Sequence, residues 1–231
     1  MRILILEHQA DAPACLLAEW AHERAHDIDV IDPVSLRGWP EPRDADAIIS
    51  LGSEHSASDT ERRWIREEIE FLAAAHSASV PVLGICFGGQ ALSAALGGTV
   101  SRAPQAEVTW RSIDTDAPDL ITAGPWPFWH EDRFDLPPGA RLIAGSETEV
   151  VAFADGASVG LQFHPEADAT VVRRWVQGGR EKLHAYGVDV AELEREIDRY
   201  GPAARELAFD LFDRIAAMWS DVRVAREPSL G

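Results

Sequence analysis

Short apolar runs alternate with helical patterns in the N-terminal part of the chain, and this alternation leaves few folds open. The apolar runs are Ile3–Leu6, Asp27–Asp32, Ala47–Gly52 and Val80–Ile85. Stretches with a helical pattern, Ala12–Ala25 and Asp59–His76, separate several of them. Runs of this kind are typical of parallel strands that are buried on both faces. The pattern predicts an α/β fold with helices on both faces of a sheet.

The second helical stretch carries the clearest helix signals. Ser58 and Glu61 have the spacing of a capping box, which predicts the start of the helix. Ile65, Ile69 and Leu72 recur at spacings that place them on one helical face.

Beyond Thr99 the pattern changes to strands that no long helix separates. We expect these strands at VTWRSI, WPFW, RLIAGS, EVVAFAD and ASVGLQF. Asp155-Gly156 is a turn signal between the last two and predicts a hairpin. We therefore expect a three-layer, flavodoxin-like fold whose sheet is mixed but mainly parallel.

The C-terminal part reads as helical. One helix is expected at Ala167–Gln177 and more helix at Glu181–Ala225, where Pro202 suits a first helical turn. We divide the chain into a domain over residues 1–178 and a helical extension packed on it over residues 179–231. Disorder is expected only at the very end, over residues 227–231.

Charge and the N-terminus exclude some classes of partner. The formal net charge is −18 and Arg and Lys form no stripe, so we expect no nucleic-acid partner. The apolar run near the N-terminus is too short for a signal peptide or a membrane span. We expect a cytoplasmic protein that does not contact a membrane.

One of the two cysteines lies where a strand is expected to turn into a helix. Gly84-Ile85-Cys86-Phe87-Gly88 has the shape of a nucleophile elbow, in which small flanking residues allow a sharp turn. Cys86 is then expected to be exposed at the end of the strand. The first amides of the following helix favour a thiolate and, beginning with that of Phe87, an oxyanion.

A thiol nucleophile needs a base, and His164 is the best candidate. It ends the expected strand GLQF, and Pro165 keeps it extended. Residues two apart in an extended chain point the same way, so Glu166 can orient the imidazole. Such a carboxylate, imidazole and thiol make up the set that nucleophilic catalysis requires.

The same residues also have plainer interpretations. Cys86 alone fits a small buried core residue, and His164 alone fits a strand-end histidine beside a helix cap. His8 and His55 lie in loops after strands but have no partner that the sequence identifies. A metal site built from the two H-x-acid pairs lacks the helical H-E-x-x-H spacing, so we expect no metal and no cofactor.

The two motifs together resemble class I glutamine amidotransferases. GICFGGQALSAALGG is similar to their nucleophile segment and LQFHPE to their second signature, in the same order and at a similar separation. The resemblance covers about Met1–Gln177. It implies that Cys86 is the nucleophile, that His164 is the general base and then acid, and that Glu166 orients His164.

The segment LGSEHS corresponds to the oxyanion loop of that family, which usually reads G-G-P. Gly52 matches the first glycine, whereas Ser53 stands at the second and Glu54 at the proline. The resemblance implies that backbone amides at Gly52, Ser53 and Phe87 hold the oxyanion. If the loop needs a positive φ at Ser53, serine is strained where glycine is not.

WHEDRFDLPPGA is similar to a segment of the stand-alone branch related to the amidotransferase domain of GMP synthetase. Glu131 replaces the usual glycine. His130 and Asp132 are expected to line the substrate pocket, and Gln90 matches a position that contacts the amino-acid end of glutamine. The alternative for His130 and Asp132 is a loop held together by its own hydrogen bonds.

The resemblance implies hydrolysis of the glutamine side-chain amide through a γ-glutamyl thioester. The sequence has neither a GxxxxGK[ST] loop nor an S-G-G-x-D-S stretch, so we expect any ammonia-accepting synthetase to be a separate subunit. One alternative is a stand-alone γ-glutamyl hydrolase or peptidase. A second alternative is a non-catalytic regulatory or binding protein with the same fold.

Overall fold

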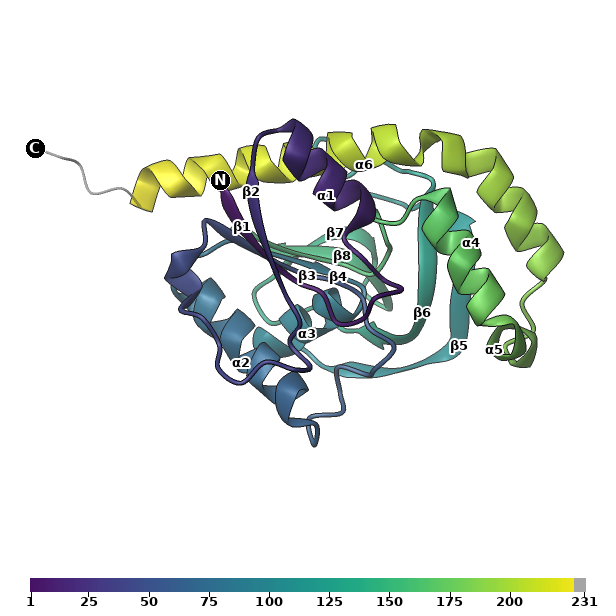
Figure 1. Ribbon diagram of the computed structural model, residues 1–231, viewed down its shortest axis with the longest axis horizontal. Coiled ribbons are helices and arrows are strands. Elements are labelled where there is room, and N and C mark those ends of the chain that lie inside the picture. Colours follow the sequence, from purple (N-terminus) through teal and green to yellow (C-terminus); the bar gives the residue numbers. More distant parts are fainter. Residues whose placement is uncertain (227–231) are drawn as a thin grey trace, which may run out of the picture.

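A seven-stranded sheet forms the centre of the molecule, with the strand order β2-β1-β3-β4-β9-β8-β7 (Figure 1). Strands β2, β1, β3, β4 and β9 run parallel, and β8 and β7 are antiparallel to their neighbours. The predicted mixed, mainly parallel sheet is therefore confirmed. The strands are β1 Arg2–Leu6, β2 Asp27–Ile31, β3 Ala47–Ser50, β4 Val82–Ile85, β7 Arg141–Ser146, β8 Glu149–Asp155 and β9 Ser158–Leu161.

This computed structural model describes the backbone over residues 1–226 and side chains over residues 1–220. The disorder expected at residues 227–231 lies outside the described part of the chain. None of the helices in the described part is long and apolar enough to cross a membrane.

Helices cover both faces of the sheet, as the alternation predicts. Side chains of alternate residues of β1 lie on opposite faces of the sheet, with Ile3 and Ile5 in one apolar cluster and Leu4 in the other. The first cluster includes residues of α1, α4 and α6, and the second includes residues of α2 and α3. The helices are α1 Cys15–Glu23, α2 Arg63–Ser77, α3 Phe87–Ala95, α4 Ala169–Gly178, α5 Arg180–Ala185 and α6 Val190–Arg226, with a short 3-10 turn at Pro42–Asp44.

The predicted hairpin at Asp155-Gly156 is confirmed. Asp155 pairs with Ser158 across the turn, and β8 and β9 are antiparallel. Gly156 has a φ of +55°, a conformation that glycine adopts without strain.

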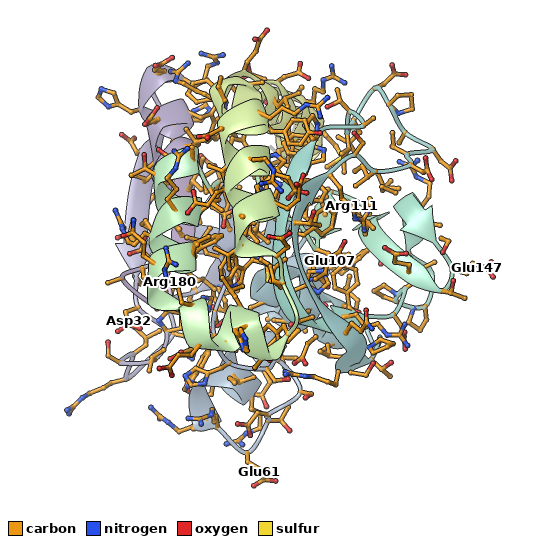
Figure 2. All side chains as sticks on the ribbon, turned by 90° about the vertical axis from the view of Figure 1, so that its right-hand side faces the viewer. Asp32, Glu61, Glu107, Arg111, Glu147 and Arg180 are labelled. Carbon is orange, nitrogen blue, oxygen red and sulfur yellow. The ribbon has the colours of Figure 1, made fainter. Side chains whose placement is uncertain are left out.

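The strands expected at VTWRSI and WPFW do not join the main sheet. They belong to β5, Val100–Arg111, and β6, Trp126–Phe134, which form a separate two-stranded antiparallel sheet (Figure 2). Their register shifts between Arg102 and Glu107. The backbone N–H of Trp110 on β5 donates to Glu196 on α6 at 2.8 Å, so the helical extension holds the two-stranded sheet in place.

The expected capping box at Ser58 is wrong. Helix α2 begins at Arg63, and Arg62 precedes it with no side-chain cap. The Ser58 amide donates instead to Ser56 Oγ at 3.2 Å, in a local turn that keeps the chain out of the helix. Because the Ser58 amide bonds to a side chain in this turn, α2 begins later in the sequence than the capping box predicts.

Pro202 does not begin a helix, contrary to the expectation. It lies inside α6, which runs unbroken over Val190–Arg226 and bends between its two halves (Figure 1). Proline within a helix removes a backbone donor and kinks the axis. The bend lets the first half of α6 pack beside α4 and the second half beside α1. At Gly201 a Cβ would lie 2.8 Å from the Cβ of Ala169, so α4 and α6 approach closely there.

Candidate active site

Cys86 lies between β4 and α3, at the carboxyl end of a central parallel strand. It precedes the first residue of α3, as the nucleophile-elbow pattern predicts, with φ 53° and ψ −107°. This is an unusual conformation for a residue other than glycine, and such strain is often found at functional sites. Cys86 is 5% exposed rather than open to solvent as expected, but it faces a cavity of about 320 Å³.

Three glycines allow the sharp turn around Cys86. A Cβ at Gly84 would lie 2.3 Å from the carbonyl oxygen of Gly88, and a Cβ at Gly88 would lie 2.0 Å from the carbonyl oxygen of Ser50. A Cβ at Gly89 would lie 2.5 Å from the carbonyl oxygen of Leu161. All three would collide with backbone atoms, so these positions have no room for a side chain.

Hydrogen bonds tie Cys86 to two neighbouring segments. Its amide donates to the carbonyl of Leu161 on β9 at 2.8 Å. Its thiol lies 3.7 Å from the carbonyl oxygen of Trp129, to which it can donate, and Gln162 Nε2 lies 3.9 Å from the sulfur. The sulfur therefore lies where β4, β6 and the residues after β9 meet.

His164 and Glu166 follow β9 and lie in contact. His164 Nδ1 is 2.7 Å from Glu166 Oε1, and both side chains are almost fully buried. The imidazole lies against the Trp175 ring, with 5.0 Å between ring centroids. On the Gly52 side, a Cβ on that glycine would lie 3.0 Å from the Cε1 of His164. Glycine at position 52 thus makes room for the ring.

The remaining nitrogen of His164 is free to face the cavity. Over residues 1–220, His164 Nε2 has no hydrogen-bond partner, and His164 and Cys86 line the same cavity. Burial lowers the pKa of His164, but its charge and hydrogen-bond interactions with Glu166 and Cys86 outweigh burial. The pKa of His164 is therefore raised well above its usual value, which favours an imidazolium.

The oxyanion loop expected at Leu51–Ser56 borders the same cavity. Gly52 and Ser53 line it, and neither has a positive φ. The loop does not need a positive φ at Ser53, so serine is not strained at this position. Phe87 is the first residue of α3, so its amide has no acceptor within the helix.

Gln90, His130 and Asp132 also line the cavity, as expected. Gln90 Nε2 donates to the carbonyl of Asp132 at 3.0 Å, and His130 Nδ1 lies 2.9 Å from that same oxygen. His130 Nε2 is 2.9 Å from a carboxylate oxygen of Glu107, which Figure 2 labels on β5. This segment therefore lines the cavity and is also held by its own hydrogen bonds.

Charged side chains form the mouth of the cavity. Glu131 pairs with Arg102 on β5 and with Lys182 on α5. Burial raises the pKa of Glu131, but hydrogen bonds with Lys182 and Tyr186 outweigh it, and the pKa is lowered. Lys182 and Tyr186 lie in the helical extension, outside every recognised motif, so no pattern in the sequence identified them as residues of the site.

Comparison with protein families shows to which family the chain belongs. The model of the family described as glutamine amidotransferase class-I matches residues 40–175. The chain belongs to this family.

Two GMP synthases are among the proteins to which this class-I glutamine amidotransferase is similar. It is 33% identical to one subunit of a glutamine-hydrolyzing GMP synthase from Sulfurisphaera tokodaii, over 55% of this chain and 71% of that one. It is 38% identical to a glutamine-hydrolyzing GMP synthase from Parafrankia over 39% of this chain, but this match spans only 18% of that protein. The chain thus spans about a fifth of the length of the first GMP synthases it matches.

A solved structure matches nearly the whole amidotransferase, including its C-terminal helices. A glutamine amidotransferase from Thermotoga maritima superposes with a TM-score of 0.82 at 25% sequence identity. The match covers 93% of this chain and 97% of that one. The extension beyond the family model is therefore part of an architecture that another glutamine amidotransferase shares.

Proposed function

We propose that this protein hydrolyses the side-chain amide of glutamine through a γ-glutamyl thioester on Cys86. The observation that carries the proposal is the meeting of the strained Cys86 and the buried His164–Glu166 pair at one cavity. The family supports a glutamine amidotransferase, and the residue roles are part of the proposal.

In the first step the Cys86 thiolate attacks the carboxamide carbon of glutamine. The resulting oxyanion is held by amides of Phe87 and of Gly52 or Ser53, each donor contributing about 3 kcal/mol. As the intermediate collapses, the C–N bond breaks and the His164 imidazolium gives its proton to the departing ammonia. The products are free ammonia and a γ-glutamyl thioester.

In the second step neutral His164 takes a proton from water, and the hydroxide attacks the thioester carbon. The C–S bond then breaks, which releases glutamate and restores the Cys86 thiolate and the His164 imidazolium. Glu166 holds His164 Nδ1–H throughout, so that Nε2 is the nitrogen that exchanges protons.

Recognition of the amino-acid end of glutamine is assigned to Gln90, His130 and Asp132. All three line the cavity beside Cys86. The relative from Sulfurisphaera tokodaii is named as one subunit of its synthase. On that basis we propose that the ammonia acceptor is a separate synthetase subunit.

A second candidate is cleavage of γ-glutamyl amides or peptides by the same steps. The mouth of the cavity favours this candidate because Lys182 and Tyr186 of the extension line it beside Glu131. These groups offer polar contacts to a leaving group larger than ammonia.

One experiment separates these functions. Purified protein and Cys86→Ala are incubated with glutamine and with γ-glutamyl dipeptides, glutamate release is measured, and the thioester is trapped by acid quench for mass spectrometry. Cys86-dependent release of glutamate from glutamine supports the proposal, and stimulation by a synthetase subunit supports the separate acceptor. Faster turnover of dipeptides supports the hydrolase, whereas no Cys86-dependent product or thioester supports a binding protein.

A further inference from the structure

A buried polar network lies beneath the oxyanion loop and has no part in the steps above. His8 follows β1, and its Nε2 lies 2.8 Å from Glu68 Oε2 on α2. Ser50 at the end of β3 donates through Oγ to Glu68 Oε1 at 2.7 Å. The side chains of His8 and Glu68 are fully buried. Polar groups buried so deeply are retained only where they are well satisfied.

The other nitrogen of His8 reaches the oxyanion loop. His8 Nδ1 lies 3.2 Å from the carbonyl oxygen of Gly52. A carbonyl oxygen and a carboxylate oxygen can both only accept, so Nδ1 donates its proton to Gly52 and Nε2 donates its own to Glu68. The His8 ring also packs edge-on against Phe87, with 4.8 Å between ring centroids, and at a tilt against Trp64, with 5.5 Å between centroids. Glu68 and these rings therefore hold His8 in place, and His8 holds the Gly52 carbonyl.

The direction of that carbonyl fixes the direction of the next amide. The peptide between Gly52 and Ser53 is trans. In a trans peptide the C=O and N–H bonds point in opposite directions. With the Gly52 carbonyl turned toward His8, the Ser53 N–H points to the other side of the loop. Gly52, Ser53 and Cys86 line the cavity, whereas His8 does not.

We infer that His8, held by Glu68, is a positioning residue that keeps the Ser53 amide directed at the oxyanion. The inference rests on the proposed function. A rotated peptide would present the Gly52 carbonyl oxygen to the developing negative charge instead of an N–H donor. The neighbouring bond from the Glu54 amide to Gln9 Oε1, at 2.7 Å, anchors the loop further along but does not act on the Gly52 carbonyl.

Two variants of His8 distinguish the roles of its two ring nitrogens. An asparagine amide can occupy the place of Nδ1, so His8→Asn keeps a donor for Gly52. A glutamine amide can occupy the place of Nε2, so His8→Gln keeps a partner for Glu68 but loses the donor. Removing an oxyanion donor costs about 10²–10³ in kcat. His8→Gln leaves the Ser53 amide in place but no longer holds its direction, so we expect kcat for glutamine hydrolysis to fall by less, about 10- to 100-fold, with KM within about threefold. For His8→Asn we expect kcat within about fivefold of the wild type, well short of that loss.

Alkylation of Cys86 by iodoacetamide is the matched control, because it needs the thiolate but forms no oxyanion. Its rate should stay within about twofold of the wild type in both variants. The inference is overturned if His8→Gln keeps the wild-type kcat, or if hydrolysis and alkylation fall in parallel, as a purely structural role requires.

If the proposed function is wrong, the outcome differs from that of a wrong inference about His8. In that case the wild type itself releases no glutamate, and crystal structures of the wild type and of His8→Gln decide the inference. We expect the Gly52 carbonyl to face residue 8 in the wild type and to be rotated in His8→Gln. An unchanged peptide in His8→Gln overturns the inference without any activity measurement.

Discussion

Replacing Cys86 by glycine should stabilise the fold relative to replacing it by alanine. Cys86 has φ 53° and ψ −107°, a region that side chains with a Cβ rarely occupy. Alanine keeps the Cβ and its strain, whereas glycine removes both. Both variants lose the thiol, so their difference isolates the backbone conformation.

The expected difference follows from two opposing effects. Strain of this kind costs about 1–3 kcal/mol, and glycine loses about 0.5–1 kcal/mol more in backbone entropy on folding than alanine does. The net advantage of glycine is then about 1 kcal/mol. In a chain of 231 residues this corresponds to a Tm about 2–4 °C higher for Cys86→Gly than for Cys86→Ala.

Differential scanning calorimetry of the two variants measures this difference. Ser53 provides the control, because it lies in the neighbouring loop and has no positive φ. There the order should reverse, with Ser53→Gly melting below Ser53→Ala. If Cys86→Ala melts at or above Cys86→Gly, the turn does not store strain at the cysteine and the reasoning is refuted.

Three further predictions concern the packing, the titration and the mouth of the site. Gly88→Ala places a Cβ against Ser50 and disrupts the bond from its amide to Leu51, so we expect a loss of about 2–4 kcal/mol in the free energy of unfolding. Gly38→Ala, in open space, should cause no loss and a gain of at most about 1 kcal/mol. The pKa of His164 is higher in the folded protein than in the unfolded chain, so protonation of His164 stabilises the fold. This stabilisation is complete below about pH 6.5, and it is lost as pH rises through the raised pKa of the folded protein. The Tm advantage of the wild type over Cys86→Ala should therefore shrink with rising pH, and NMR should show a lower His164 pKa in Cys86→Ala; an unchanged pKa contradicts the pairing. Glu131→Gly removes the carboxylate partner of Lys182 and leaves Arg102 paired with Asp132, so hydrolysis of γ-glutamyl peptides with a free carboxylate should rise about 2–5-fold. This gain should be lost in high salt, and equal rates contradict the prediction.

Local sequence patterns predicted the turn and the pair that follows β9. Gly84 and Gly88 flank Cys86 in the sequence, and the space around them explains why both must be glycine. His164 and Glu166 are two positions apart, so their contact needs only local geometry. These features depend on short stretches of chain, which is why the sequence alone carries them.

Contacts between distant segments could not be predicted in the same way. Glu68 lies 60 positions from His8 and looks like an ordinary acidic residue of an amphipathic helix, so nothing in the sequence pairs them. Strands β5 and β6 have the same pattern as sheet strands, but they form a sheet of their own, with β5 packed against α6 and β6 packed against α3. Pro202 resembled a helix start because a tolerated kink and a first turn have the same local signal.

The bent helix α6 has a consequence for how the protein can be shortened. Its aromatic residues Phe212 and Trp219 are almost fully buried in the same apolar cluster as β1 and α1, and Trp219 Nε1 donates to the carbonyl of Ala157 at 3.1 Å. A fragment trimmed to the region that matches the family would expose that face of the sheet to water. The smallest autonomous folding unit is therefore longer than the region by which the family is recognised.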